Sequence, residues 1–398
     1  MSALAPSSCE SLLQSMVAID SVNGNISGRN DAERAIAEHL DAVGSDMGLE
    51  TTRLPVEGTD TFNLLVTHRV GDAAPWLLFE SHMDTVSVEG MSIDPFGGRI
   101  EGGRMFGRGA CDTKASGATM LCALADYARQ DARQDARQDA RPNNVALVFT
   151  TDEEIGKGGI KAFVDDHLPG LGWRPFGAVV GEPTMMKPVI AHNGIRRWPI
   201  RTRGVAAHSC APSLGRSAIS MMVKVIDAIE SHYISSLTTD HPLTGKAQCS
   251  INIIEGGAQI NIIPEHCEIR IDRRIVPGED SAAVPGAVEE VLDRLRLAHP
   301  EIQVEQGEPY IVDAPLDPAA GADFTATVQD VLNEMGRDSV PEGAQYGTDA
   351  SQLAEIRVPA VVIGPGDIAQ AHTHDEWIEV EQLGIAAEFY GRLMRCEA

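Results

Sequence analysis

The sequence predicts an α/β protein with a central, mostly parallel sheet, into which a smaller α+β domain is inserted. Short, continuous apolar segments alternate with helical stretches over most of the chain, whereas the middle of the chain alternates apolar and polar residues. A length of 398 residues is enough for two or three domains with buried cores. These observations predict a folded, multidomain protein.

The amino-acid composition and net charge limit the kinds of partner that this protein is expected to bind. Hydrophobic residues make up 43% and charged residues 23%, which is typical of globular proteins. The 32 Lys and Arg against 58 Asp and Glu give a formal charge of −26, which repels nucleic-acid phosphates and anionic membranes. The first basic residue is Arg29, and no apolar run has the length of a signal or membrane helix. We therefore expect a cytoplasmic protein without nucleic-acid or membrane partners.

The seven scattered cysteines show no C-x-x-C and are expected to be reduced thiols.

The elements of the larger domain follow in chain order. A capping box at Ser7-Ser8-Cys9-Glu10 predicts a helix to about residue 19, and a second helix is expected over 31–43, before Gly44. Continuous apolar runs at 76–79, 145–149, 178–180 and 360–363 predict central strands that are covered on both faces.

The middle of the chain has the residue pattern of a sheet that exposes one face to solvent. Cys267, Ile269 and Ile271 alternate with charged residues. The expected order is strand 195–203, helix 214–231, strands 248–254 and 266–275, helix 281–297 and strand 301–305, which is the split βαβ order of a ferredoxin-like domain. We expect a first domain over 1–188 and 306–398, interrupted by an inserted domain over 189–305.

One segment is of low complexity: 130–141 holds three copies of Gln-Asp-Ala-Arg. On a helix this repeat aligns like charges at i, i+4, which weakens the helix. We expect a frayed surface projection rather than a binding motif.

Possible metal ligands stand where the apolar strands end. His82 follows the first strand, Glu153 and Glu154 the second, Glu182 the third and His372 the fourth, and Asp112 ends a glycine-rich loop. Residues at the carboxyl ends of parallel strands converge on one edge of a sheet. Each alone is most often a cap or loop residue, but such residues at four strand ends and one loop together favour a metal site. His and carboxylate ligands suit zinc, cobalt or manganese, and a carboxylate-rich set suits two metals with a shared bridging carboxylate.

These residues occur in motifs that resemble the M20 metallopeptidase family, in its acetylornithine deacetylase and succinyl-diaminopimelate desuccinylase branch. The motifs are His82-Met83-Asp84, Gly107-Arg108-Gly109 to Asp112, Asp152-Glu153-Glu154, Gly181-Glu182-Pro183-Thr184, and Ala371-His372 with Asp375-Glu376. The likeness covers nearly the whole chain in order. It implies a zinc-peptidase-like catalytic domain with an inserted ferredoxin-like lid and dimerisation domain.

The resemblance also implies a ligand set for two zinc ions per subunit, with cobalt or manganese as alternatives. One ion would be held by His82, Asp112 and Glu182, and the other by Asp112, Glu154 and His372. Asp112 would be the bridge.

The same resemblance implies roles for the neighbours of these ligands. Asp84 would orient His82, and Glu153 would be the general base. Sequence alone does not separate Glu153 from Glu154. His374 is a rival ligand that fits the motif less well than His372, and Cys111 is expected to be a packed residue rather than a nucleophile. The bond between Asp112 and Thr113 is expected to be cis.

Three further site residues are implied for the inserted domain. His208, in Gly204-Val205-Ala206-Ala207-His208-Ser209, would reach the active site of a partner subunit in a homodimer and donate to the developing oxyanion. Asn261 would hold the substrate's amide oxygen, and Arg274 its carboxylate. Without the resemblance, a capping Asn and a surface Arg would be the better interpretations.

The function expected from this resemblance is that of a dinuclear zinc amidohydrolase that removes an N-acyl group from an amino acid, a reaction of amino-acid biosynthesis. Deacetylation of acetylornithine comes first, desuccinylation of succinyl-diaminopimelate second, and an M20 carboxypeptidase or dipeptidase third. The segment 364–372 looks like acetylornithine deacetylases, whereas Glu182 is the ligand type of desuccinylases. An inactive metal-binding interaction module is the alternative outside enzymes.

Overall fold

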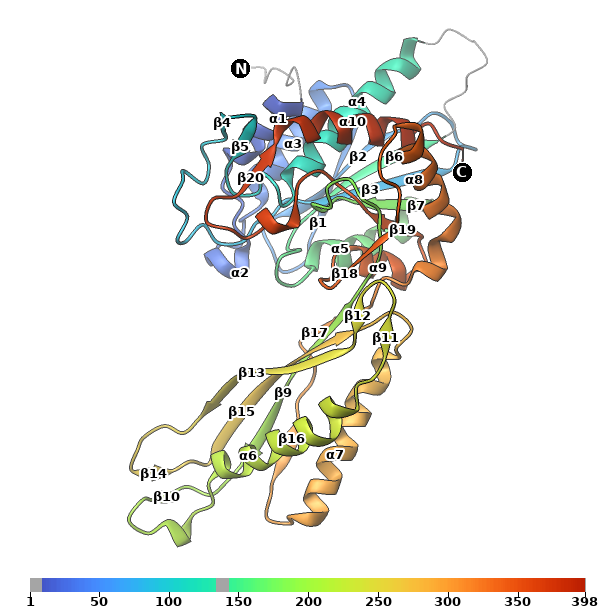
Figure 1. Cartoon of the computed structure of the whole chain (residues 1–398). Helices are drawn as coiled ribbons and strands as arrows, with labels where there is room; N and C mark the ends of the chain where they lie inside the picture. The colour runs from blue at the N-terminus through green and yellow to red at the C-terminus, as the bar shows by residue number, and fades with distance from the viewer. Residues whose placement is uncertain (1–8, 134–142, 398) are drawn as a thin grey trace. The chain divides into compact units, whose positions relative to one another are not determined.

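The computed structural model describes residues 9–133 and 143–397, which form two compact units (Figure 1). The first unit comprises the described parts of Met1–Ile190, Pro318–Glu342 and Thr348–Ala398. The second unit comprises Ala191–Asp317 and Gly343–Gly347. Most of the Gln-Asp-Ala-Arg repeat and the serines of the expected capping box lie outside the described residues.

An eight-stranded sheet forms the centre of the first unit. Its order is β1 (Glu50–Pro55), β2 (Phe62–His68), β6 (Asn144–Thr150), β3 (Trp76–His82), β7 (Pro175–Val180), β19 (Ala360–Val362), β8 (Val189–His192) and β18 (Glu342–Ala344). The neighbours β6, β3, β7 and β19 run parallel, whereas β2 is antiparallel to β6 and β8 is antiparallel to β19. Every residue of β3 and β6 is buried, as the continuous apolar runs predict.

Helices complete the first unit. In Figure 1, α4 (Lys114–Arg133) and α10 (Val380–Leu393) pack together above the sheet, and α1 (Cys9–Val17) packs against both. The other helices of this unit are α2 (Gly24–Ser27), α3 (Arg34–Asp46), α5 (Gly158–Ala162), α8 (Ala322–Glu334) and α9 (Ala350–Glu355). A small sheet joins β20 (Trp377–Glu379), β5 (Arg104–Phe106) and β4 (Arg99–Glu101). Among the described residues, no helix combines the length and apolar character needed to cross a membrane.

The expected bounds of the second helix are wrong. The helix α3 begins three residues later than expected and runs through Gly44. A Cβ at Gly44 would lie only 3.1 Å from Thr51 Cγ2, so this glycine serves close packing against β1 and not a helix stop. The left-handed glycine that follows the helix is Gly48, with φ of +81°.

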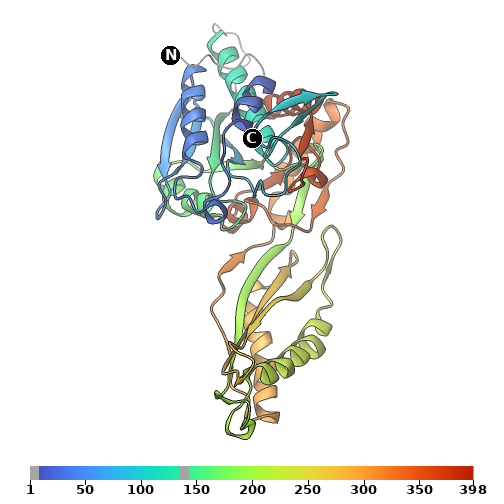
Figure 2. The same ribbon diagram turned by 90° about the vertical axis from the view of Figure 1, so that its left-hand side faces the viewer.

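The second unit contains a five-stranded antiparallel sheet. Its order is β13 (Gln248–Gly256), β15 (His266–Ile275), β9 (Gly194–Arg203) and β16 (Val304–Gln306), and β17 (Ile311–Asp313) also pairs with β9. Helices α6 (Ala218–Ala228) and α7 (Val284–Ala298) cover one face, which Figure 2 shows from the side. Residues of β15 alternate between this core and the open face, as expected. The strand β17 was not predicted.

Two short strand pairs extend the second unit. They are β10 (Ala207–His208) with β14 (Ile262–Ile263), and β11 (Asp240–His241) with β12 (Gly245–Lys246). The first pair places His208 opposite Ile262, next to Asn261.

Candidate metal centre

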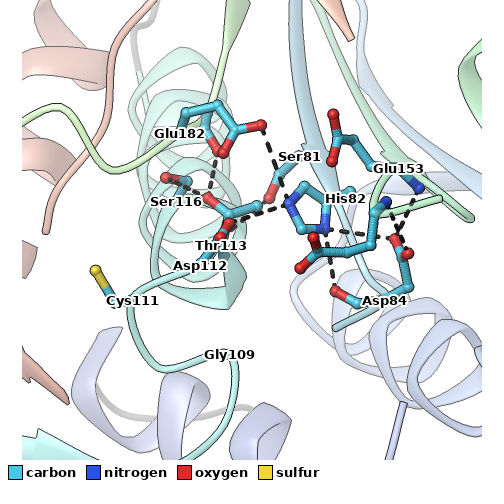
Figure 3. Close-up of polar contacts among 12 residues, drawn as sticks. Ser81, His82, Asp84, Gly109, Cys111, Asp112, Thr113, Ser116, Glu153 and Glu182 are labelled. Carbon is cyan, nitrogen blue, oxygen red and sulfur yellow. Dashed lines mark hydrogen bonds and ion pairs between the residues drawn. The ribbon is translucent and has the colours of Figure 1, made fainter. Parts of the chain in front are cut away.

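The chemistry-bearing residues of the first unit gather at the carboxyl edge of its sheet. His82 is the last residue of β3, Glu182 follows β7, and Glu153 and Glu154 follow β6. Asp112 comes from the loop that leads into α4, and its side chain lies next to that of His82 in Figure 3. The parallel strands therefore bring together residues that are far apart in sequence.

Asp112 is the centre of this arrangement. Its Oδ1 lies 3.3 Å from His82 Nε2, and its Oδ2 lies 3.3 Å from His372 Nε2. His82 Nε2 is also 4.0 Å from Glu182 Oε1, and His372 Nε2 is 3.0 Å from Glu154 Oε2. The two oxygens of one carboxylate thus face two separate groups of possible ligands.

Asp84 holds the other side of His82 and the chain that follows β6. His82 Nδ1 lies 3.0 Å from the Asp84 backbone oxygen and 3.4 Å from its Oδ1. The Asp84 carboxylate also accepts hydrogen bonds from the backbone N–H groups of Glu153 and Glu154, at 3.0 and 3.1 Å. Asn23 donates a further hydrogen bond to it at 2.7 Å. This network directs Nε2 of His82 into the cluster and fixes both glutamates.

Negative charge in the cluster is poorly compensated. Burial, and then the charge of Asp112, raise the pKa of Glu154 to about 8 and that of Glu182 well above its usual range. Glu154 Oε1 is buried without a hydrogen-bond partner. Burial alone would raise the pKa of Asp112, but hydrogen bonds from His372 and His82 outweigh it and lower that pKa. An orphaned buried oxygen within a set of imidazole and carboxylate donors fits a divalent cation such as zinc.

Glu153 is also at the cluster. Burial raises the pKa of its carboxyl. Two trios have possible ligand atoms within 4.8 Å of one another: His82 with Glu153 and Glu182, and His82 with Asp112 and Glu154. Glu153 and Glu154 differ in their partners, because Glu154 faces His372 whereas Glu153 Oε1 lies 3.7 Å from Lys157 Nζ.

Glu376 supports the loop that carries Asp112. Its carboxylate accepts hydrogen bonds from the backbone N–H groups of Gly109, Cys111 and Asp112 at 2.9 to 3.0 Å, and from Arg108 at 2.7 Å. The sequence marked Glu376 as part of a motif, but it gave no role, because the partners are backbone groups more than 260 residues away.

The two rival residues have other contacts. His374 is exposed, and its Nδ1 lies 2.7 Å from the Gly90 oxygen. Cys111 is buried, and its Sγ donates to the Asp367 oxygen at 3.4 Å. Burial raises the pKa of the Cys111 thiol well above its usual value, so it stays a thiol. The peptide bond between Asp112 and Thr113 is cis, which confirms the expectation.

The three implied residues of the inserted domain lie in the second unit. The backbone N–H of Ser209 donates to the Asn261 oxygen at 2.9 Å, so His208 and Asn261 are neighbours. Arg274 lies near the far end of β15, and its Nε donates to Asp272 Oδ1 at 2.7 Å. A ten-residue strand spans roughly 30 Å. The second unit therefore does not bring Arg274 together with the other two.

Comparison with known proteins identifies the family. Residues 78–395 match the model of peptidase family M20/M25/M40. The chain belongs to this family. As an M20 amidohydrolase it is a metal-dependent hydrolase, and the resemblance stated from the sequence is confirmed.

Relatives of this M20 protein include acetylornithine deacetylases. That of Myxococcus xanthus is 31% identical over 348 residues, which cover 86% of this chain and 83% of the relative. That of Photorhabdus laumondii is 27% identical over 396 residues, with 96% and 95% covered.

Solved structures share the fold. The aminopeptidase PepT from Bacillus cereus has a TM-score of 0.74 at 23% identity and covers 96% of both chains. The Bacillus subtilis YXEP protein, a dinuclear metal-binding peptidase of family M20, has a TM-score of 0.70 at 14% identity, with 97% of this chain and 96% of that chain covered. These likenesses confirm the predicted α/β fold class.

Proposed function

We propose that this M20 protein is a two-metal deacylase whose donor set suits zinc, with acetylornithine as substrate. The observation that carries the proposal is the Asp112 carboxylate, whose two oxygens each face a histidine. One metal would be held by His82, Asp112 and Glu182, and the other by Asp112, Glu154 and His372. Cobalt or manganese would suit the same nitrogen and oxygen donors.

Bound divalent metals would polarise the amide carbonyl and make water more acidic. The chain's own residues supply the remaining chemistry. Glu153 would take a proton from the attacking water on its carboxylate and deliver it to the nitrogen of the leaving amine. The contact of Glu154 with His372 supports this division of roles between the two glutamates. Asp84 would keep His82 in the tautomer that presents Nε2.

The substrate proposal rests on the names of the relatives and on the net charge of this chain compared with the charge of each substrate. Acetylornithine deacetylases are 27 to 31% identical to this chain over most of its length. A succinyl substrate adds a carboxylate, which would need a dedicated cation in a chain of net charge −26. Arg274 would bind the α-carboxylate that both substrates share. Succinyl-diaminopimelate remains the second candidate, because Glu182 is the ligand type that favours it.

We also propose that the first unit is the catalytic domain and the second the lid and dimerisation domain of a cytoplasmic homodimer. The edge strand β13 exposes Ile253 and Ile254, which are 42% and 55% accessible, and α6 exposes Val223. Exposed apolar residues at a sheet edge favour pairing with a second copy. Arg274 lies near the carboxyl end of β15, whereas His208 lies in β10, which pairs with β14 before the start of β15, so the two are too far apart to hold one small substrate. His208 and Asn261 would therefore serve the partner's site.

A substrate panel tests the activity. The purified protein, with metal content measured, is assayed with N-acetylornithine, N-succinyl-diaminopimelate and a set of dipeptides. We expect the largest kcat/KM for N-acetylornithine and about two zinc ions per chain. A preference for the succinyl substrate would move the proposal to a desuccinylase, and no hydrolysis by metal-loaded protein would favour an inactive interaction module.

Subunit mixing tests the dimer. Glu153→Gln and His208→Ala chains are each expected to be nearly inactive. After subunit exchange, a mixed dimer contains one complete site, so activity should return. If subunit exchange is verified but activity does not return, His208 does not belong to a site shared between subunits.

A further inference from the structure

Lys157 occupies an unusual backbone position beside the candidate base. It directly precedes α5, in the segment Gly156-Lys157-Gly158-Gly159 that turns into this helix, with φ of +57° and ψ of +32°. A left-handed conformation is free for glycine and costs a residue with a Cβ about 1 kcal/mol or more. Glycine fills the neighbouring positions of this turn, so the lysine is distinguished by its side chain and not by backbone preference.

The Lys157 side chain is buried and directed inward. The residue is only 5% exposed, although lysine is rarely buried without a charged partner. Its Nζ donates to the Thr348 oxygen at 2.7 Å and lies 3.7 Å from Glu153 Oε1. The backbone carbonyl therefore anchors the ammonium group within reach of the candidate base.

Fixed positive charge is scarce around Glu153. In the described part of the chain, Lys157 is the only Lys or Arg that forms an ion pair with Glu153 within 4 Å. The nearby histidines are proposed metal ligands. Arg108 pairs with Glu376 beneath the loop of Asp112.

We propose that Lys157 is a positioning residue for Glu153, which holds its carboxylate in the orientation needed for proton transfer. This inference rests on the proposed function, in which Glu153 is the base. A carboxylate in a crowded acidic cluster is repelled by its neighbours, and one anchored cation selects the rotamer that faces it. Lys157 is not one of the proposed metal ligands, and its Nζ contacts Thr348 and Glu153.

The test compares three variants in the same assay of N-acetylornithine hydrolysis. Lys157→Met should lower kcat about 10- to 100-fold, because small misplacements of a catalytic group have effects of this size. KM and metal content should stay within about twofold, since the change removes no ligand. Lys157→Arg should retain more activity than Lys157→Met. Lys161→Met is the matched control on α5, because Lys161 Nζ donates to the Gly156 oxygen and not to Glu153.

A double mutant separates positioning from a purely structural role. If Lys157 acts through Glu153, Lys157→Met should have little further effect on the residual kcat of Glu153→Gln. A full additional loss in that background would overturn the proposal, as would an unchanged kcat in Lys157→Met alone. If the wild-type protein with its metals hydrolyses neither acylated substrate, the proposed function fails instead.

Discussion

The two units differ in whether their buried and half-buried carboxylates are paired with arginine or lysine. On the open face of the second unit two acids have arginine partners: Asp272 accepts from Arg197 and Arg274, both at 2.7 Å, and Glu268 accepts from Arg201 at 2.7 Å. At the sheet edge of the first unit, Glu154 and Glu182 have no Lys or Arg in an ion pair within the described residues.

The pKa values follow this difference. Burial would raise the pKa of Glu268, but hydrogen bonds from Arg270 and Arg201 outweigh it and lower that pKa. In the first unit, burial raises the pKa of Glu154 to about 8. Acids that are paired by arginine stabilise a surface, whereas acids left without a counter-charge mark the place where an external cation fits.

Removal of the shared ligand should have the largest effect. Asp112→Asn is expected to lose both metals and all measurable deacylase activity, because one carboxylate serves both ligand groups. Metal analysis after gel filtration measures the loss. Asp272→Asn is the control from the arginine-paired face and should keep both metals. Retention of two metals by Asp112→Asn would remove the proposed bridge.

The second largest effect on activity is expected from replacing Glu153, the candidate base. Glu153→Gln should lower kcat by roughly 10²- to 10⁴-fold while both metals stay bound. Glu154→Gln should instead deplete one metal, because Glu154 contacts His372. The two variants are compared by metal content and kcat. The opposite pattern would exchange the roles of the two glutamates.

Loss of Arg274 should affect substrate binding more than turnover. Arg274→Ala is expected to raise KM roughly 10- to 100-fold with a small change in kcat, the size of a lost charge-assisted clamp. Arg270→Ala, which breaks a pair on the same strand, is the control and should leave KM unchanged. An equal KM in both variants would show that Arg274 belongs only to the surface network.

The smallest effect is expected from an uncompensated acid outside the cluster. Burial, and then Asp84, raise the pKa of Glu33 from its usual 4.5 to about 7. The folded state thus binds the proton more tightly, and its stability falls as pH rises through this window and stays low above it. Glu33→Gln should therefore raise the unfolding free energy by up to about 3 kcal/mol at pH 8 and hardly at all at pH 4.

Thermal or urea unfolding at the two pH values measures this effect. Glu268→Gln is the matched control, and it should lower stability by less than about 1 kcal/mol at pH 8, because its arginine partners are half-exposed. A stability gain for Glu33→Gln that is the same at both pH values would contradict the titration argument.

Much of the fold could be predicted from local pattern. Continuous apolar runs located β3, β6, β7 and β19, and the strict alternation of β15 located the open sheet of the second unit. The predicted bounds of helix α3 were wrong because the sequence does not distinguish a glycine needed for close packing from a glycine that ends a helix. The strand β17 has only three residues and carries no periodicity of its own.

The site could be predicted only in part, for a related reason. Strand ends and motifs pointed to the residues that converge on Asp112, since parallel strands share one edge. The supports of Asp112 and of Glu153 come from tertiary contacts: Glu376 binds backbone N–H groups of the Asp112 loop, and Lys157, beside Glu153, is anchored by a backbone carbonyl. A hydrogen bond to a distant backbone group leaves no pattern in the sequence. The engagement of Arg274 by Asp272 was not expected either.

Anomalous diffraction from crystals of the zinc-loaded protein would show whether two metals bind on either side of Asp112. We expect two zinc peaks per chain, one beside His82 and Glu182 and the other beside His372 and Glu154, each in contact with one oxygen of Asp112. A single peak, or a second peak away from Asp112, would contradict it.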